Sequence, residues 1–249
     1  MSQWSRSLSI GAFPFALLAS SCETKSTYVP DDAGTDASVQ DAGGDATTIG
    51  DAGNTCSPGA ITGFTPSWTP PTKFHQGKCV DKQIRELVAC YFDAPGKPSN
   101  CPEILKEQDC TACLFTSSVL AQAGPLVIEG KSARLNVPGC IATFEGDVSD
   151  KSCGAKYKAA ADCALAACAD NCPGEDAAAV AARTACAKQS LTTVCKSFAD
   201  AAACSDDLLA SDGKAAACAA GNDFVESAVV LGKLFCGQSA TDAGAPDGN

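Results

Sequence analysis

Seventeen cysteines in 249 residues are the feature that most limits how this chain can fold. Sixteen of them lie between residues 56 and 236, which leaves Cys22 alone near the N-terminus. An even number of cysteines at this density is typical of a disulfide framework in an exported protein. We therefore expect all sixteen to form disulfides, in a connectivity that the sequence does not choose: Cys56, Cys79, Cys90, Cys101, Cys110, Cys113, Cys140, Cys153, Cys163, Cys168, Cys172, Cys186, Cys195, Cys204, Cys218 and Cys236.

The competing interpretations of these cysteines are a metal site and a haem site. A zinc site usually needs several closely spaced pairs of Cys or His. Only Cys110 and Cys113 have that tight spacing, and His75 is the single histidine of the chain. Haem attachment requires a His directly after Cys-x-x-Cys, where this chain has Leu114. We therefore expect neither a metal nor a cofactor.

The first 21 residues have the pattern of an export signal. Arg6 supplies positive charge, residues 8–18 are largely apolar, and small residues precede Cys22. The apolar run is shorter than the roughly 20 residues that a transmembrane helix needs. We therefore expect residues 1–21 to be removed as a signal peptide and the rest of the chain to be exported.

Cys22 is the expected attachment point of a lipid. Residues 19–22 read Ala-Ser-Ser-Cys and resemble the lipobox of bacterial lipoproteins. Lipidation would also explain the odd thiol, since sixteen cysteines remain to pair. Leu18 lies one position earlier than in the usual pattern, so cleavage to a soluble secreted chain is the alternative. We expect the lipid to anchor the protein to the cell envelope, at the outer membrane or in the periplasm.

Small and acidic residues dominate both ends of the mature chain. Residues 23–55 carry seven acids and one Lys, and Asp-Ala-Gly recurs among them. Such a segment buries too little to offset its ordering entropy, so residues 22–55 are expected to be a lipidated Cys followed by a disordered spacer. Residues 237–249 repeat the composition and are expected to be a disordered tail. The formal net charge of −11 excludes the basic surface that nucleic-acid binding requires.

Residues 56–236 are expected to form one cysteine-rich, all-α domain, a helical bundle stapled by disulfides. Ala side chains are abundant in this region and bury little area each, so the disulfides are expected to supply stability that the core lacks. Helical spacing of apolar residues and helix-start signals predict helices over 78–92, from Pro102 to before Gly124, over 152–170, from 175 onward, and over about 222–235.

The helix that begins near residue 175 has two alternative lengths. Cys186, Cys195 and Cys204 are nine residues apart, which is two and a half helical turns. In an unbroken helix Cys195 would point away from the other two, as in a central helix stapled on both faces. A break near Ser190 is the alternative, and the sequence leaves it open.

Two segments of the domain are not expected to be helical. Residues 63–76 are rich in Pro and aromatic residues, and they are expected to lie across the helices as an arm or, alternatively, to form an exposed docking motif. Residues 124–139 carry apolar runs on both sides of a Gly and are expected to form at most one small β-hairpin. Lys131 and Arg134 make this hairpin the candidate for a surface that contacts a partner.

The sequence offers no candidate catalytic residue. His75 lacks a Gly-x-Ser-x-Gly or His-Glu-x-x-His context. A redox role for Cys110 and Cys113 is disfavoured, because Glu107 and Asp109 lie just before them and would raise a thiol pKa. We expect a non-catalytic binding protein that is tethered to the membrane by its lipid and contacts an unknown protein or surface ligand. The alternative is a carrier of a small apolar ligand between the helices.

The layout resembles cysteine-rich lipoproteins of the myxobacterial type. The resemblance is carried by Cys22, the Asp-Ala-Gly spacer, the Gly139-Cys-Ile-Ala142 stretch, the Ala-rich region from Cys163 to Cys172, and Leu234-Phe-Cys-Gly237. It covers nearly all of the chain, and its motifs are compositional. It implies a lipid anchor and a cysteine-rich core, and it implies no known activity.

The disulfide framework predicts the result of a thiol count. Mature protein that is denatured without reduction should show no reactive thiol among the sixteen cysteines, because a disulfide sulfur does not react with a thiol reagent. Two or more thiols that appear only after chelation would instead indicate a metal site.

Overall fold

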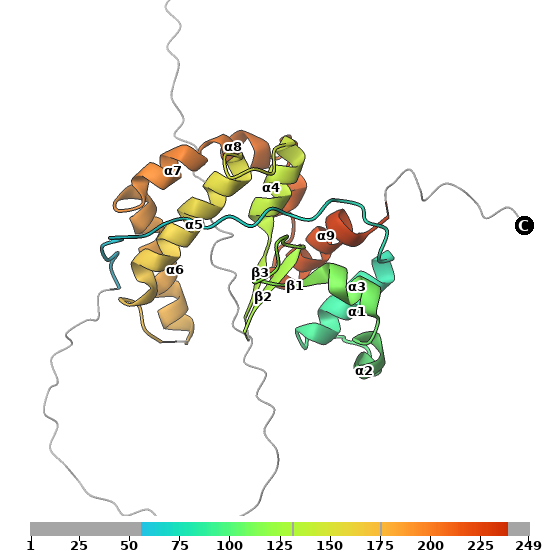
Figure 1. Ribbon diagram of the computed structural model, residues 1–249. Helices are drawn as coiled ribbons and strands as arrows, with labels where there is room; N and C mark the ends of the chain where they lie inside the picture. The colour runs from blue at the N-terminus through green and yellow to red at the C-terminus, as the bar shows by residue number, and fades with distance from the viewer. Residues whose placement is uncertain (1–55, 131, 175, 239–249) are drawn as a thin grey trace, which may run out of the picture.

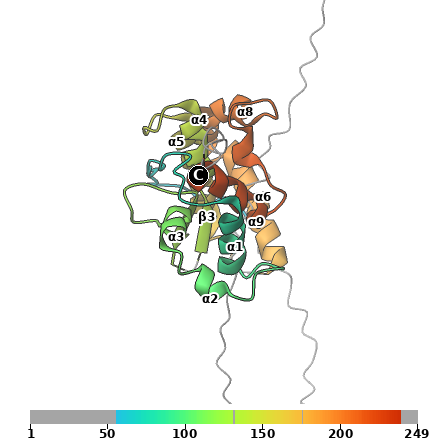
Figure 2. The same cartoon turned by 90° about the vertical axis from the view of Figure 1, so that its right-hand side faces the viewer.

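The computed structural model describes residues 56–130, 132–174 and 176–238, so Cys22, Lys131, the signal, the spacer and the end of the tail lie outside the described residues. Two groups of helices flank a small three-stranded sheet (Figure 1). Figure 2 shows α4 and α8 at one end of the molecule and α2 at the other. The helices and strands are α1 (Asp81–Tyr91), α2 (Cys101–Ile104), α3 (Gln108–Leu114), β1 (Phe115–Ser117), β2 (Leu126–Glu129), β3 (Ser132–Leu135), α4 (Val137–Glu145), α5 (Cys153–Ala169), α6 (Ala177–Thr192), α7 (Lys196–Ala202), α8 (Cys204–Leu209), the 3₁₀ helix η2 (Ala216–Ala219) and α9 (Phe224–Cys236).

The all-α fold class is confirmed, and the longest helices begin where the sequence predicts. Polar caps fix these starts, since each cap side chain accepts a hydrogen bond from an otherwise unpaired helix N–H. Ser152 accepts from Ala155 N at 3.0 Å at the start of α5. Asp176 opens α6 and Asp223 opens α9 in the same way. The helix expected over 78–92 is α1, which begins a few residues later at Asp81.

The prediction of one helix from Pro102 to before Gly124 is wrong. The chain there forms two short helices, α2 and α3, and then strand β1. β1 pairs with β2 in parallel, and Thr116 Oγ1 accepts a hydrogen bond from Gly124 N at 2.9 Å across the intervening loop. The pairing depends on a strand eleven residues further along the chain, which local helical periodicity does not reveal.

The predicted hairpin is confirmed, and β1 extends it to a three-stranded sheet. β2 and β3 pair antiparallel, with Leu126 opposite Leu135 and Val127 opposite Arg134. Side chains alternate between the two faces of a strand. Leu126 and Ala133 therefore face the buried core that α9 covers, while Val127 and Arg134 share the opposite face.

All sixteen cysteines of the described domain form disulfides, with Cα–Cα distances of 4.8 to 6.0 Å. This density of disulfides indicates an oxidising, extracytoplasmic environment. The disulfide pairs are 56–172, 79–110, 90–101, 113–236, 140–218, 153–204, 163–195 and 168–186.

In the described part of the chain, every helix is too short or too polar to cross a bilayer.

The open question about Cys195 is settled by a break after α6. The helix ends at Thr192, and the N–H groups of Thr193 and Cys195 both hydrogen-bond to the carbonyl of buried Ser190. The chain then turns, so that Cys195 bonds to Cys163 on α5 instead of facing away from it. The unbroken helix is therefore excluded, and Cys186, Cys195 and Cys204 all bond to cysteines of α5.

Residues 56–79 form an arm that crosses the molecule, as the first interpretation of residues 63–76 predicts. Figure 1 shows this teal segment running past α5 and α4 towards α9. Phe64 packs edge-on against Phe198 with ring centroids 5.5 Å apart, and Phe74 packs against Phe144 and Phe235. The arm thus links the two buried clusters, one around α1, α9 and the sheet and the other around α5 and α6.

Gly154 provides a test of the close packing between α4 and α5. A Cβ at this position would meet Pro138 O and would lie 2.7 Å from Ala142 Cβ and 2.8 Å from Ala142 N. Gly154→Ala should therefore lower the free energy of unfolding by about 1–3 kcal/mol, measured by urea unfolding with the disulfides intact. Alanine is the better helix former by about 1 kcal/mol, so a stabilised variant would contradict this close helix contact.

Candidate functional site

A pocket of about 310 Å³ lies between the arm, the sheet and α5, and we call it the α5 pocket. The arm contributes Ser67 and Thr69 to its wall. The last residue of β1, Ser117, and the next residue, Ser118, also line it. The remaining lining comes from the outer face of the sheet and its flanks and from one face of α5: Ala123, Val127, Glu129, Arg134, Leu135, Asn136, Val137, Pro138, Tyr157, Lys158, Ala161, Asp162 and Leu165.

Two acids and two bases in the lining form one ionic network. Arg134 on β3 lies 3.2 Å from a carboxylate oxygen of Glu129 and 3.8 Å from one of Asp162 on α5. Lys158 forms a second ion pair with Asp162, one helical turn away on α5. The Asp162 side chain is only 18% exposed, so these charges interact more strongly than a fully solvated pair would. The network joins the sheet to α5 across the pocket.

Buried groups give the pocket a fixed shape. The amide of Asn136 donates to the carbonyls of Ala123 and Gly124 at 3.1 and 2.9 Å, and its oxygen accepts from Gly139 N. These three bonds hold the end of β3, the loop before β2 and the start of α4 together. Tyr157 is only 7% exposed on the pocket side of α5. Burial disfavours the phenolate and raises the pKa of Tyr157 to about 12.

Of the two residues predicted for a partner surface, Arg134 lines the α5 pocket. Lys131 lies outside the described residues. Nε of Arg134 is buried and, among the described residues, has no hydrogen-bond partner. Sequence reasoning missed Tyr157, Lys158 and Asp162, which α5 brings to the same pocket. The spacing of Lys158 and Asp162 in an otherwise Ala-rich helix was the signal that could have indicated them.

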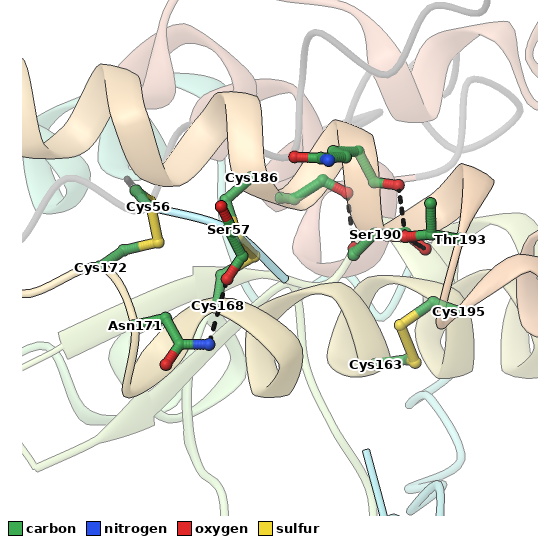
Figure 3. The surroundings of a disulfide bond; sticks show 12 residues. Cys56, Ser57, Cys163, Cys168, Asn171, Cys172, Cys186, Ser190, Thr193 and Cys195 are labelled. Atoms are coloured by element: carbon green, nitrogen blue, oxygen red, sulfur yellow. Dashed lines mark hydrogen bonds between the residues drawn. A yellow bond between two sulfur atoms is a disulfide. The ribbon is translucent and has the colours of Figure 1, made fainter. Parts of the chain in front are cut away.

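One cluster of sulfur atoms has the proximity of a metal site. Cys56, Cys172 and Cys186 have sulfurs within 4.8 Å of one another. Figure 3 shows why this proximity does not make a metal site here: Cys56 bonds to Cys172, and Cys186 bonds to Cys168. Zinc binds cysteine as thiolate, and both disulfides remove the thiolates. Asn171 Nδ2 also donates to Ser57 O at 3.1 Å, which holds the start of the arm beside these bonds (Figure 3).

The residues considered for catalysis lie outside the lining of the α5 pocket. Cys110 and Cys113 do not pair with each other, because Cys110 bonds to Cys79 and Cys113 bonds to Cys236. His75 lies on the arm, where its backbone N–H donates to Leu234 O at 2.9 Å, and it does not line the α5 pocket. The Cys-x-x-Cys spacing therefore belongs to two structural disulfides.

No family model, curated protein or solved structure matches this chain.

The raised pKa of Tyr157 predicts a loss of stability at high pH. The ordinary pKa is 10.0, so between pH 10 and pH 12 the unfolded chain loses the phenolic proton while the folded chain keeps it. The stabilisation by this group is complete below pH 10 and declines as the pH rises to 12, by about 3 kcal/mol in total. Tyr157→Phe should remove this part of the pH dependence, measured by brief urea unfolding at each pH. A parallel slope in both proteins would contradict a buried, neutral Tyr157.

Proposed function

We propose that this protein is a lipid-anchored extracytoplasmic binding protein of the myxobacterial lipoprotein type, which captures its ligand at the α5 pocket without catalysis. The observation that carries the binding role is the pocket itself. Its wall is built from three parts of the chain that are far apart in the sequence, and buried Asn136 fixes three of the neighbouring backbone segments. Binding sites of this kind are largely formed before the ligand arrives.

The lining of the pocket supports this role over that of a carrier for apolar ligands. A carrier needs a continuous apolar cavity that surrounds its ligand. The α5 pocket instead exposes the ionic network of Glu129, Arg134, Lys158 and Asp162 to the ligand. Burying an apolar molecule against these groups would remove water from them without a replacement hydrogen bond.

A tether supports capture near the membrane. The segment of residues 23–55 is rich in acidic and small residues, and in this proposal it serves as the spacer between the anchor and the folded domain. A lipid on Cys22 would keep the protein at the envelope, because each buried methylene contributes about 0.8 kcal/mol to membrane binding. The disulfides are consistent with this location, since they persist in an oxidising compartment.

The anchor is tested by the partition of the mature protein into detergent. Wild-type protein should enter the detergent phase, with a blocked N-terminus and the added mass of acyl chains on Cys22. Cys22→Ser should leave the protein in the aqueous phase, because serine cannot form the thioether.

Ser21→Ala is the matched control for that experiment, since it keeps a small residue next to the cleavage site and should partition like wild type. A wild-type protein that stays in the aqueous phase and begins with unmodified Cys22 would contradict the anchor.

A further inference from the structure

We infer that the α5 pocket binds a small neutral molecule with several hydroxyl groups, and that a sugar ring is the chemical class that fits its lining. The inference rests on the proposed function in one respect, namely that this pocket is the binding site. Its volume of about 310 Å³ lies at the small end of ligand pockets, which span about 300–1,000 Å³. A monosaccharide or a disaccharide is a ligand of that size.

The charges of the lining favour a neutral ligand. Glu129 and Asp162 balance Arg134 and Lys158, and each of the four contacts an opposite charge. An anion would bind beside the two acids of the network and a cation beside its two bases, so a like-charge repulsion offsets part of each attraction. A balanced lining also produces little net field to attract an ion.

The same groups retain hydrogen-bonding capacity for hydroxyls. A guanidinium has five N–H donors and a carboxylate has about four acceptor positions, more than the ion pairs use. A sugar hydroxyl both donates and accepts, so neighbouring hydroxyls can bond to Arg134 and Asp162 while the ion pair remains. Ser67 and Thr69 on the arm and Ser117 on β1 also line the pocket and add further hydroxyls.

The apolar part of the lining suits the carbon face of a ring. Val127 on β2 and Ala161 and Leu165 on α5 line the pocket, and Leu165 is exposed to solvent at 39%. A sugar ring presents C–H groups on its faces and hydroxyls at its edge. It can therefore place a face on these side chains and its edge on the ionic network. An ion of the same size contacts only the ionic network.

Trp68 provides the readout. It lies on the arm between the two pocket residues Ser67 and Thr69, and its Nε1 donates to Val148 O at 2.9 Å. The only other tryptophan is Trp4, which belongs to the segment expected to be removed as a signal. Fluorescence of the mature protein should therefore report changes at the pocket wall.

The experiment titrates the full mature protein, in a detergent without sugar groups, with glucose, galactose, N-acetylglucosamine and maltose. Glutamate and lysine serve as ionic probes of similar size. We expect at least one sugar to change Trp68 fluorescence and to release or absorb heat in calorimetry, with a Kd of about 1 mM or below and an affinity at least about tenfold above that of either ionic probe. Asp162→Asn should weaken the sugar at least about tenfold, because it replaces a charged acceptor.

Asp200→Asn is the matched control, because Lys196 and Asp200 on α7 form an ion pair with the same spacing outside the pocket. It should bind sugar like wild type. Thr69→Ala tests the arm wall without changing an ion pair and should weaken binding about threefold. Urea unfolding of each variant verifies that it is folded.

Three results would overturn the inference: no sugar bound up to about 10 mM, an ionic probe that binds more tightly than every sugar, or an equal loss in Asp162→Asn and Asp200→Asn. These results are independent of the anchor. An ionic probe that binds and is weakened by Asp162→Asn keeps the pocket as the site and contradicts the ligand class. A sugar that binds equally well to wild type and Asp162→Asn contradicts the pocket as the site. A protein that binds sugar but stays in the aqueous phase contradicts only the tether.

Discussion

Covalent linkage of α5 to the chain that follows it is the constraint on which the rest of the structure depends. Cys153, Cys163 and Cys168 bond to cysteines at the start of α8, just before α7 and on α6. α5 is mostly alanine on its buried side, and small side chains gain little from burial. A disulfide typically contributes about 2–4 kcal/mol by restricting the unfolded chain. The three bonds thus supply stability where side-chain packing is thin, and they fix the helix that carries one wall of the α5 pocket.

The small residues along α5 also allow neighbouring helices to pack close to it. Gly154 lets α4 lie against its first turn, and the alanines after it let α6 and α7 lie against the rest. Lys158 and Asp162 follow Gly154 on the same face of α5 at steps of four residues, and they line the pocket together with Tyr157. The same helix therefore carries both the disulfides and the polar residues of the pocket wall. A fixed wall keeps the polar groups in place, so little ordering entropy is lost when a ligand binds.

The sequence predicted the helices with strong local signals and missed features that depend on distant partners. Ala-rich composition identified α5, helical spacing of apolar residues identified α9, and the apolar runs around Gly130 identified the hairpin. β1 was missed because its pairing with β2 is not local. The connectivity was out of reach because sixteen cysteines allow very many pairings. Arg134 was identified by its charge on the hairpin, whereas the pocket required the position of α5 beside β3, which is a property of the tertiary fold.

Disulfide mapping of the unreduced mature protein tests the central role of α5 most directly. Elastase cuts among the alanines between Cys163 and Cys168, so mass spectrometry can assign each cysteine separately. The predicted result is three cross-linked peptides that join Cys153 to Cys204, Cys163 to Cys195, and Cys168 to Cys186. A bond between two cysteines of α5, or from α5 to the segment of α1–α3, would contradict the fixed wall and the pocket built on it.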